Sequence, residues 1–354
     1  MIDITFFGKF LIFSDIHFHH THRFSHITPD GYTVRELEHL SCADDLIKLA
    51  EEHGIEAFIC LGDLWGPVGD NMSAQTLAVL CEFIDKLRKV KPVLIIVGNH
   101  DLSANTNNHH IHKLNVFEYW DNVKVYSTPT VEGNFVFMPY CTSHEYATNF
   151  LEAIENKEEK IVFSHLELKG ISFNNGIETT KGVELDLLNK FKLVLQGHYH
   201  SGTGYGSKIK VIGSTQRLSF KDHGKSRDNI VLFDSINNKI KRYSFNCPDW
   251  LVFTDDNISD ILTTPVNNYV KVDITTDLLL TPEIQNRLES FKGKEIHIDL
   301  TRLHFNKKSS ADIVEQTEDD VSVIKQFIEK TENTAEHKEL LLKEGIRLLD
   351  KVKV

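Results

Sequence analysis

The feature that most constrains this chain is a series of short polar motifs, each of which directly follows an apolar run. Short apolar runs bounded by turn residues are typical of buried strands. In open α/β sheets, ligands bind at the carboxyl ends of the strands, so we expect these polar side chains to converge. The runs and motifs, in order, are FLIFS and Asp15-x-His17, FICL and Gly62-Asp63, VLIIV and Gly98-Asn99-His100-Asp101, IVFS and His165, and LVLQ and Gly197-His198-x-His200.

The converging side chains have the chemistry of a two-metal site. Carboxylates, an amide oxygen and several imidazoles form a mixed nitrogen and oxygen ligand field, which suits Mn, Fe or Zn better than a thiolate site would. We expect two divalent ions, with Mn²⁺ first and Mg²⁺, Fe²⁺ or Zn²⁺ as alternatives. A bridging carboxylate holds two cations about 3.5–4 Å apart, a spacing at which a metal-activated hydroxide attacks phosphorus. The expected ligands are Asp15, His17 and His200 for one metal, Asn99, His165 and His198 for the other, and Asp63 as the bridge.

The third motif adds two candidate catalytic residues that are not expected to be direct ligands. His100 is predicted to lean over the metals and to donate a proton or a hydrogen bond to the leaving oxygen. Asp101 is predicted to orient an imidazole such as His100, or else a backbone amide. Gly62, Gly98 and Gly197 precede ligands, where a sharp turn or a positive φ is easiest without a Cβ atom.

The pattern of elements predicts an α/β layered domain over residues 1–246. In its first half, apolar runs alternate with the amphipathic stretches ELEHLSCADDLIKLAEEHG and SAQTLAVLCEFIDKLRK. The later apolar runs are closely spaced and mostly lack intervening helices, which predicts that much of the second half of the sheet system is antiparallel. We therefore expect two facing mixed β-sheets flanked by helices.

Two smaller parts are expected after this domain. Over residues 247–308, YVKVDIT and KEIHIDL are predicted strands around a helix that Pro282 opens, which makes a small βαβ cap domain. Over residues 309–354, an acidic linker precedes two helical segments, predicted to form a tethered hairpin. Their apolar positions follow helical spacing, and such a face packs either on its own domain or on a partner.

The order DxH, GD, GNHD, H and GHxH across residues 10–200 resembles the calcineurin-like metallophosphoesterase signature. That superfamily includes protein phosphatases, cyclic-nucleotide phosphodiesterases, nucleotidases and DNA nucleases, so the resemblance alone does not choose a substrate. Protein Ser/Thr phosphatases carry GDxxDRG and GNHE. This chain instead has Gly62-Asp63-Leu64-Trp65-Gly66 and ends its third motif in Asp101.

A further segment, VIGSTQRLSFKDHG at residues 211–224, resembles the GS-x-x-x-x-SF segment of SbcD-type exonucleases. The cap and the tail are similar in order and size to that family's DNA-capping domain and ATPase-binding hairpin. The resemblance implies a metal-dependent DNA exonuclease and endonuclease that processes DNA ends in recombination or repair. It implies DNA and an SMC-like ATPase of the SbcC type as partners, and a homodimer formed through residues 73–89 and 112–119.

Two other functions remain as alternatives. One is a small-molecule phosphodiesterase or phosphatase of the same superfamily. The other is a non-catalytic scaffold, which is disfavoured because every ligand position is filled.

Composition bears on partners and on compartment. The net charge of −12 counts against a nucleic acid partner, an objection that weakens if metals or a basic subunit supply positive charge. No run of about 18 uncharged apolar residues is present, so we expect no membrane span. The five cysteines are scattered and never form a C-x-x-C pair, which favours a reducing cytoplasm, that of the host if a phage encodes the chain.

Histidine clusters are the main departure from the SbcD-type pattern. Many members follow the DxH motif with Leu-Gly, whereas this chain has Phe18-His19-His20-Thr21-His22. A second cluster comprises His109, His110 and His112. These imidazoles are either solvated loop residues or, in part, contacts to substrate phosphate near the metals.

Overall fold

The computed structural model describes residues 7–19, 24, 26–66, 73–103, 111–171, 179–202, 204–222, 228–275, 279–291 and 293–298. Residues 1–273 and 280–297 belong to one compact unit. The predicted hairpin over 309–354 lies outside the described residues. Within the described ranges, no helix has the length and apolar character needed to cross a bilayer.

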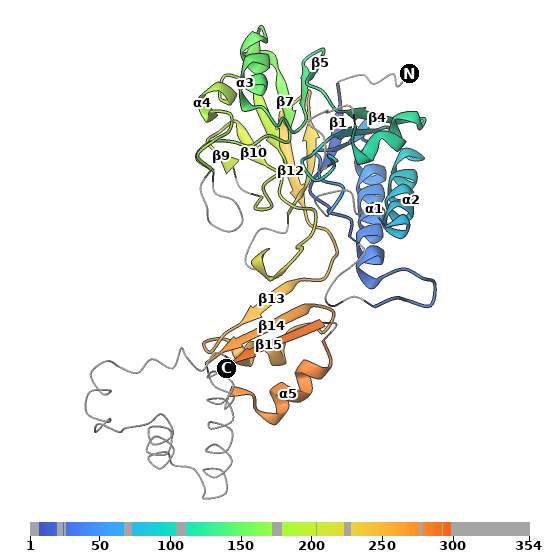
Figure 1. Ribbon diagram of the computed structural model, residues 1–354, viewed down its shortest axis with the longest axis vertical. Helices are drawn as coiled ribbons and strands as arrows, with labels where there is room; N and C mark the ends of the chain where they lie inside the picture. Colours follow the sequence, from blue (N-terminus) through green and yellow to red (C-terminus); the bar gives the residue numbers. More distant parts are fainter. Residues whose placement is uncertain are drawn as a thin grey trace, which may run out of the picture. The chain divides into compact units, whose positions relative to one another are not determined.

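Two six-stranded sheets form the main part of the chain (Figure 1). Both are mixed, which confirms the predicted α/β class with two facing mixed sheets. The first sheet has the order β12 (Lys239–Tyr243), β11 (Ile230–Asp234), β1 (Lys9–Phe13), β2 (Ala57–Cys60), β3 (Val93–Ile96) and β4 (Val123–Tyr126). The second has the order β5 (Thr130–Glu132), β6 (Phe135–Met138), β7 (Ile161–Ser164), β8 (Leu193–Gln196), β10 (Ile209–Val211) and β9 (Gly204–Tyr205).

The predicted antiparallel arrangement is wrong for the centre of the second sheet. There β6, β7, β8 and β10 run parallel, with Phe137 opposite Phe163 and Phe163 opposite Leu195. The connections contain α3 (His144–Ala153) and α4 (Leu185–Leu188), which the sequence analysis did not identify. Every residue of β6, β7 and β8 is buried, as is typical of parallel strands covered on both faces. Antiparallel pairing occurs between β5 and β6, β9 and β10, β1 and β11, and β11 and β12.

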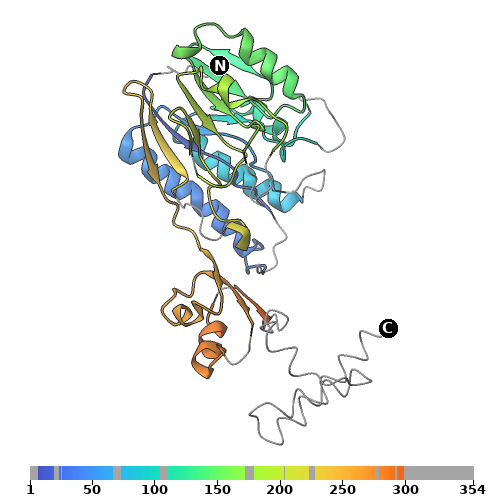
Figure 2. The ribbon, with the colours of Figure 1, turned by 90° about the vertical axis from the view of Figure 1, so that its left-hand side faces the viewer.

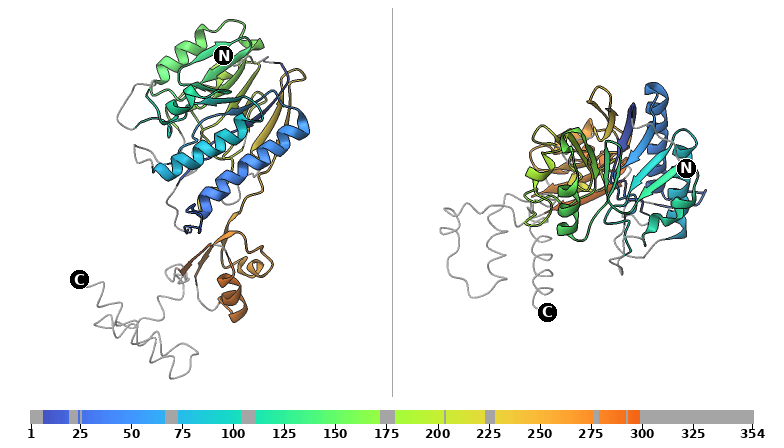
Figure 3. Two further views of the ribbon diagram at one scale, coloured as in Figure 1. Left: turned by 90° about the vertical axis from the view of Figure 1, so that its right-hand side faces the viewer. Right: turned by 90° about the horizontal axis from the view of Figure 1, so that it is seen from above.

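The two predicted long helices are confirmed as α1 (Val34–His53) and α2 (Ala74–Arg88). Thr33 and Glu36 form a capping box that satisfies amides at the start of α1, and Gly54 ends this helix in a left-handed conformation. Ser73 caps α2 by accepting from the Thr76 amide at 3.0 Å. Figures 2 and 3 show α1 and α2 side by side on the first sheet, and α3 on the far side of the second.

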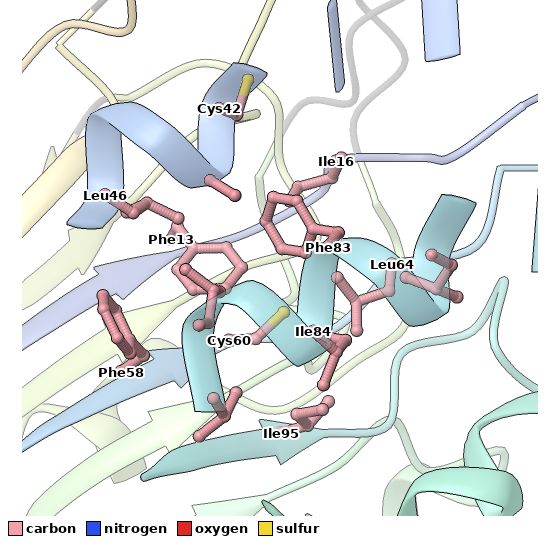
Figure 4. Packing of buried hydrophobic residues seen from close by; sticks show 14 of the residues in the cluster. Phe13, Ile16, Cys42, Leu46, Phe58, Cys60, Leu64, Phe83, Ile84 and Ile95 are labelled. Atoms are coloured by element: carbon pink, nitrogen blue, oxygen red, sulfur yellow. The ribbon is translucent and has the colours of Figure 1, made fainter. Parts of the chain in front are cut away.

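The strands of the first sheet send alternate side chains to two separate cores. In β1, Phe10 and Ile12 pack between the two sheets, against aromatic side chains of β6 and β7. Leu11 and Phe13 point to the opposite face, beneath α1 and α2. There Phe13 meets Phe83 of α2 with ring centroids 6.0 Å apart (Figure 4). A third core fills the space between the second sheet and α3.

A three-stranded sheet follows, with the order β13 (Trp250–Phe253), β14 (Tyr269–Ile274) and β15 (Gly293–Ile298). The predicted helix between β14 and β15 is α5 (Pro282–Glu289), with Pro282 at its first position. Strand β13, which pairs in parallel with β14, was not predicted. The short 3-10 helices are η1 (Lys113–Tyr119), η2 (Lys157–Glu159), η3 (Phe220–Asp222) and η4 (Ile258–Leu262).

Candidate metal centre

The parallel strands deliver the predicted ligands to one place. Strands β1, β2 and β3 are neighbours in the first sheet, and β7 and β8 are neighbours in the second. Because each pair runs parallel, the carboxyl ends lie at the same sheet edge, where the loops carry the polar motifs. The structure brings together all the predicted ligands: Asp15, His17, Asp63, Asn99, His165, His198 and His200.

The first group of side chains is Asp15, His17 and His200. His17 Nε2 lies 3.8 Å from Asp15 Oδ1 and 3.2 Å from His200 Nε2. The Asp15 carboxylate is fully buried, and its Oδ1 atom has no hydrogen-bond partner among the described residues. A buried acceptor of this kind requires a proton or a cation beside it.

The second group surrounds Asn99. Its Oδ1 atom lies 3.1 Å from His165 Nε2 and 2.9 Å from His198 Nδ1. Asp63 Oδ2 is 3.3 Å from His165 Nε2 and 3.8 Å from His17 Nε2. Asp63 therefore faces both groups at once, the position that a bridging ligand needs.

In two imidazoles, the hydrogen bond made by Nδ1 on the side away from the centre identifies the tautomer. It shows that the other ring nitrogen, Nε2, faces the centre without a proton when the ring is neutral. His165 Nδ1 donates to the Leu61 carbonyl at 2.5 Å, and His17 Nδ1 donates to the Trp65 carbonyl at 3.2 Å. A carbonyl oxygen only accepts, so both Nδ1 atoms carry the proton and both Nε2 lone pairs face inward in the neutral rings. Lone pairs of nitrogen and oxygen thus converge on two positions, and this donor set fits divalent cations.

The electrostatics agree with this donor set. Burial lowers the pKa of His17 to about 3 and that of His198 to about 3, so both rings are neutral ligands at pH 7. Burial also lowers the pKa of His165, but the Asp63 and Asp15 carboxylates outweigh it and raise the pKa to about 9. Burial opposes ionisation of Asp63, yet His165 and His17 hold its pKa well below the usual range. The centre between Asp63 and His165 therefore attracts positive charge.

Among the described residues, the Asp101 carboxylate accepts hydrogen bonds from backbone amides only. This is one of the two roles that the sequence left open for it. Its Oδ2 atom accepts from the amides of Asp63 at 2.9 Å and Gly98 at 2.8 Å, and its Oδ1 atom accepts from Trp65 at 2.9 Å. The carboxylate thus ties the loop after β2 to the loop after β3. The His100 ring instead donates from Nδ1 to the Gly66 carbonyl at 2.5 Å.

In the loops after β1, β2 and β8, the residues with left-handed backbones are the proposed ligands themselves. Asp15, His17, Asp63 and His198 all have left-handed backbones, with φ of 54°, 54°, 51° and 69°. Non-glycine residues adopt this conformation at a cost of order 1–3 kcal/mol, and surrounding contacts must hold them there. The sequence analysis expected a sharp turn or a positive φ at the three neighbouring glycines, and of these Gly62 has a positive φ, of 100°.

Close packing explains the other two glycines. A Cβ atom on Gly98 would lie 2.2 Å from Asp63 Oδ1, and one on Gly197 would lie 2.5 Å from Ser14 Oγ. Hydrogen at these positions lets the loops approach one another.

Residues 214–222 support the centre in a way that ligand spacing did not predict. Ser214 Oγ donates to the Asp15 carbonyl at 2.8 Å, and Thr215 Oγ1 donates to the Ser14 carbonyl at 2.7 Å. The Asp222 carboxylate lies 3.9 Å from His200 Nδ1. The only signal for this segment in the sequence was its resemblance to the GS-x-x-x-x-SF pattern.

The histidine clusters divide between two environments. His19 lies beside the metal centre and lines a cavity there. His112 is buried, with Nε2 3.2 Å from Glu118 Oε1, so the solvated interpretation is wrong for this residue. Residues 20–22 and 109–110 lie outside the described residues.

Comparisons with known proteins agree with the geometry. Residues 8–202 match the family model of the calcineurin-like phosphoesterases. Exonuclease subunit 1 of Enterobacteria phage T4 is 25% identical over 274 residues, which cover 71% of this chain and 80% of the phage protein. Putative phosphoesterase 244L of Invertebrate iridescent virus 6 is 29% identical over 251 residues, which cover 63% of this chain and 80% of the viral protein.

A solved structure, that of the Pseudomonas putida nuclease MPE, shares 17% identity with this chain at a TM-score of 0.27. The alignment covers 57% of this chain and 66% of that one. A likeness at this level carries no argument about function.

Proposed function

The chain belongs to the calcineurin-like phosphoesterase family, and we propose that it is a divalent-metal-dependent DNA nuclease that acts on DNA ends. The observation that carries the proposal is the convergence of imidazole nitrogen atoms and carboxylate and amide oxygen atoms around Asp63. The similarity to an exonuclease subunit over 71% of the chain supports DNA as the substrate. Within this proposal, Mn²⁺ is the expected metal.

The seven proposed ligands would have distinct duties in this mechanism. Asp15, His17 and His200 would hold one cation, Asn99, His165 and His198 would hold the other, and Asp63 would be shared by both. Bound divalent cations supply an acidified water and screen the phosphate charge. The protein's part is to hold its donor atoms in place, and Asp101 does this from behind by fixing the amides of Asp63 and Gly98. Asp101 is therefore a positioning residue.

The proposed role of His100 is to assist the leaving oxygen, and its contacts support this role. Its backbone amide donates to Asp63 Oδ1 at 2.9 Å, and its ring donates from Nδ1 to Gly66. The ring lies edge-on to the His17 ring, with centroids 4.7 Å apart. In the imidazolium form, Nε2 carries the proton that the leaving oxygen of DNA needs.

The proposal includes partners. We assign residues 309–354 to binding of an SMC-like ATPase of the SbcC type, residues 247–308 to DNA capping, and a reducing cytoplasm as the compartment. A homodimer through η1 is supported by exposed apolar side chains there: Tyr119 is 87% exposed and Val116 is 37% exposed. All five cysteines are free thiols in the structure, which suits a reducing compartment.

One experiment tests the nuclease proposal directly. The purified chain is incubated with Mn²⁺, or with excess EDTA, on linear duplex, hairpin and single-stranded DNA, and in parallel on bis-p-nitrophenyl phosphate. We expect Mn²⁺-dependent cleavage of DNA and of the small diester. Hydrolysis of the small ester with all three DNA forms intact would favour the small-molecule phosphodiesterase instead. Inactivity on every substrate with two metals bound would favour the scaffold.

A further inference from the structure

A cavity of about 330 Å³ lies directly beside the metal centre. One wall consists of His17, His100 and His200, which belong to the centre. The opposite walls are built from side chains to which the proposed metal chemistry gives no task. These are His19, Arg35, His39 and Leu218.

The cavity walls are held firmly. Arg35 and His39 are buried on α1, where Arg35 forms an ion pair with Glu38. The other oxygen of Glu38 accepts from the Tyr269 hydroxyl at 3.0 Å. The Arg35 guanidinium lies 5.7 Å from the ring centroids of both Trp250 and Tyr269. A side chain with this many contacts is already in its binding conformation, so little entropy is lost when a ligand arrives.

The cavity is on one particular side of the centre. His100 lines it, whereas His165 and His198 do not. Since His100 is the residue placed to protonate the leaving oxygen, the cavity opens on the leaving-group side of a phosphate bound at the metals. Whatever is attached to that oxygen is therefore the group nearest to the cavity.

We propose that this cavity binds the nucleobase of the nucleotide on the leaving side of the scissile phosphate. The inference rests on the proposed phosphodiesterase chemistry and adds a base-binding subsite to it. Imidazole rings are flat surfaces on which bases stack, the lining imidazoles of His19, His100 and His200 are partly exposed, and Leu218 adds an apolar contact. The volume is near the lower end of the roughly 300–1,000 Å³ range of small-molecule pockets, which fits one nucleoside-sized group.

The charges favour a base over a second phosphate as the occupant. Among the described residues that line the cavity, Arg35 is the one with a permanent charge, and Glu38 already neutralises it. A phosphate would have to compete with that carboxylate for the guanidinium. A stacked base does not compete with Glu38 for the guanidinium, because it contacts the planar faces of the lining rings.

The test separates the base from the phosphate. Isothermal titration calorimetry on the Mn²⁺-loaded full chain compares deoxyadenosine 5′- and 3′-monophosphates, which stand for a leaving nucleoside attached through O5′ or O3′, with deoxyribose 5- and 3-phosphates, which lack the base. We expect one of the two nucleotides to bind about tenfold more tightly than its sugar phosphate, as loss of one stacked base predicts. Leu218→Trp, which fills the cavity, and His19→Ala, which removes a partly exposed imidazole from its wall, should reduce that ratio to about twofold and leave the affinity for the sugar phosphates unchanged.

Two control variants match these changes. Leu37→Trp places the same ring on an exposed position of α1, and His297→Ala removes an exposed imidazole from β15, so both should keep the tenfold ratio. If His19→Ala fails to fold, Leu218→Trp decides, because Leu218 is only partly buried. Equal weakening of the nucleotide and its sugar phosphate, or no base-dependent affinity in the unmodified chain, would overturn the inference.

Failure of the nuclease proposal gives a different result. A chain that binds the nucleotide in a base-dependent manner yet leaves DNA intact refutes the nuclease and retains the cavity as a nucleotide site. A chain that cuts DNA while binding each nucleotide and its sugar phosphate equally retains the nuclease and refutes the base-binding subsite.

Discussion

At the scale of single residues, the centre stores strain that its contacts must balance. Four of the seven proposed ligands have left-handed backbones, at an order-of-magnitude cost of 1–3 kcal/mol each. Buried hydrogen bonds hold them, such as Asp15 N to the Gly62 carbonyl at 3.0 Å and His17 N to the Asp63 carbonyl at 3.0 Å. Each ligand therefore depends on a neighbouring loop, and substitutions at the centre should affect metal binding before they affect the cores.

Asp63→Asn is predicted to weaken both metals together. An amide replaces the carboxylate that faces His165 and His17, and the bridge loses its negative charge. We expect a loss of metal affinity beyond the roughly 10–100-fold that removal of an outer contact costs, and no measurable DNA cleavage. Metal content by atomic emission and Mn²⁺ titration measure this, with exposed Asp256→Asn as the matched control. Two metals retained with normal turnover would refute the bridging assignment.

His100→Ser is predicted to retain both metals and the fold while DNA cleavage falls by about 10²–10⁴-fold, the usual contribution of a general acid. Nitrophenolate leaves without a proton, so hydrolysis of bis-p-nitrophenyl phosphate should fall much less. The ratio of the two kcat values is the measurement. Equal losses on both substrates would indicate charge stabilisation rather than proton donation, and loss of a metal would make His100 a ligand.

Asp101→Asn is predicted to destabilise the loops behind the ligands. The carboxylate accepts from three backbone amides, whereas a carboxamide has one accepting oxygen and would direct an NH₂ group at an amide N–H. Leaving a buried donor unsatisfied costs about 1–3 kcal/mol. We expect a lower Tm in the metal-free protein together with weaker metal binding. An unchanged Tm would show that these amides find other acceptors.

At the scale of elements, the centre is an assembly of loops pressed together at the sheet edge. Residues 214–222 reach both Asp15 and His200, and Arg217 in the same segment forms an ion pair with Asp249 at the start of the three-stranded sheet. Phe220 packs against Trp250 with ring centroids 4.9 Å apart. One short segment thus contacts both the metal centre and β13.

Gly98→Ala tests how tightly these loops are packed. The added methyl group would lie 2.2 Å from Asp63 Oδ1 and 2.4 Å from Asp63 N, so the loops must separate. Overpacking of this kind costs about 1–3 kcal/mol, and here it also displaces the bridging carboxylate. We expect reduced Tm and weak metal binding. Gly204→Ala is the control, because its Cβ would meet nothing closer than 3.3 Å. Normal metal affinity in Gly98→Ala would show that the loops are looser than described.

At the scale of the whole molecule, the metal centre is built within residues 15–200. The support from 214–222 comes before β13, and among the described residues the cavity adds only Leu218 from beyond residue 200. The residues that follow β15 lie outside the described part of the chain. Because the described side chains of the centre all precede β13, we expect catalysis of small esters not to require the tail.

Deletion of residues 311–354 is predicted to leave metal-dependent hydrolysis of bis-p-nitrophenyl phosphate within about twofold of the full chain, and to abolish binding to an SMC-like ATPase. Pull-down with the ATPase and the esterase assay measure the two effects separately. Full-length protein with the apolar tail positions changed to Ser is the control for folding. A truncated chain that does not fold would show that the tail packs on its own domain.

The sequence by itself was sufficient to identify the polar side chains that converge at the sheet edge, because their identity depends on local patterns. An apolar strand followed at once by Asp15-x-His17 or by Gly62-Asp63 specifies both the burial of the strand and the chemistry at its end. The helices α1 and α2 could likewise be predicted from local sequence, because Thr33, Ser73 and Gly54 are caps that act within a few residues.

Only the tertiary structure decided the features that depend on residues far apart in the chain. The parallel order of β6, β7 and β8 follows from packing on both faces, which spacing along the chain does not encode. The amide contacts of Asp101, the left-handed ligands and the cavity between His39 and Leu218 likewise arise where separate loops meet. Such contacts join residues that are close in space but far apart in the sequence. The periodicity of a sequence reports only on neighbours within one helix or strand.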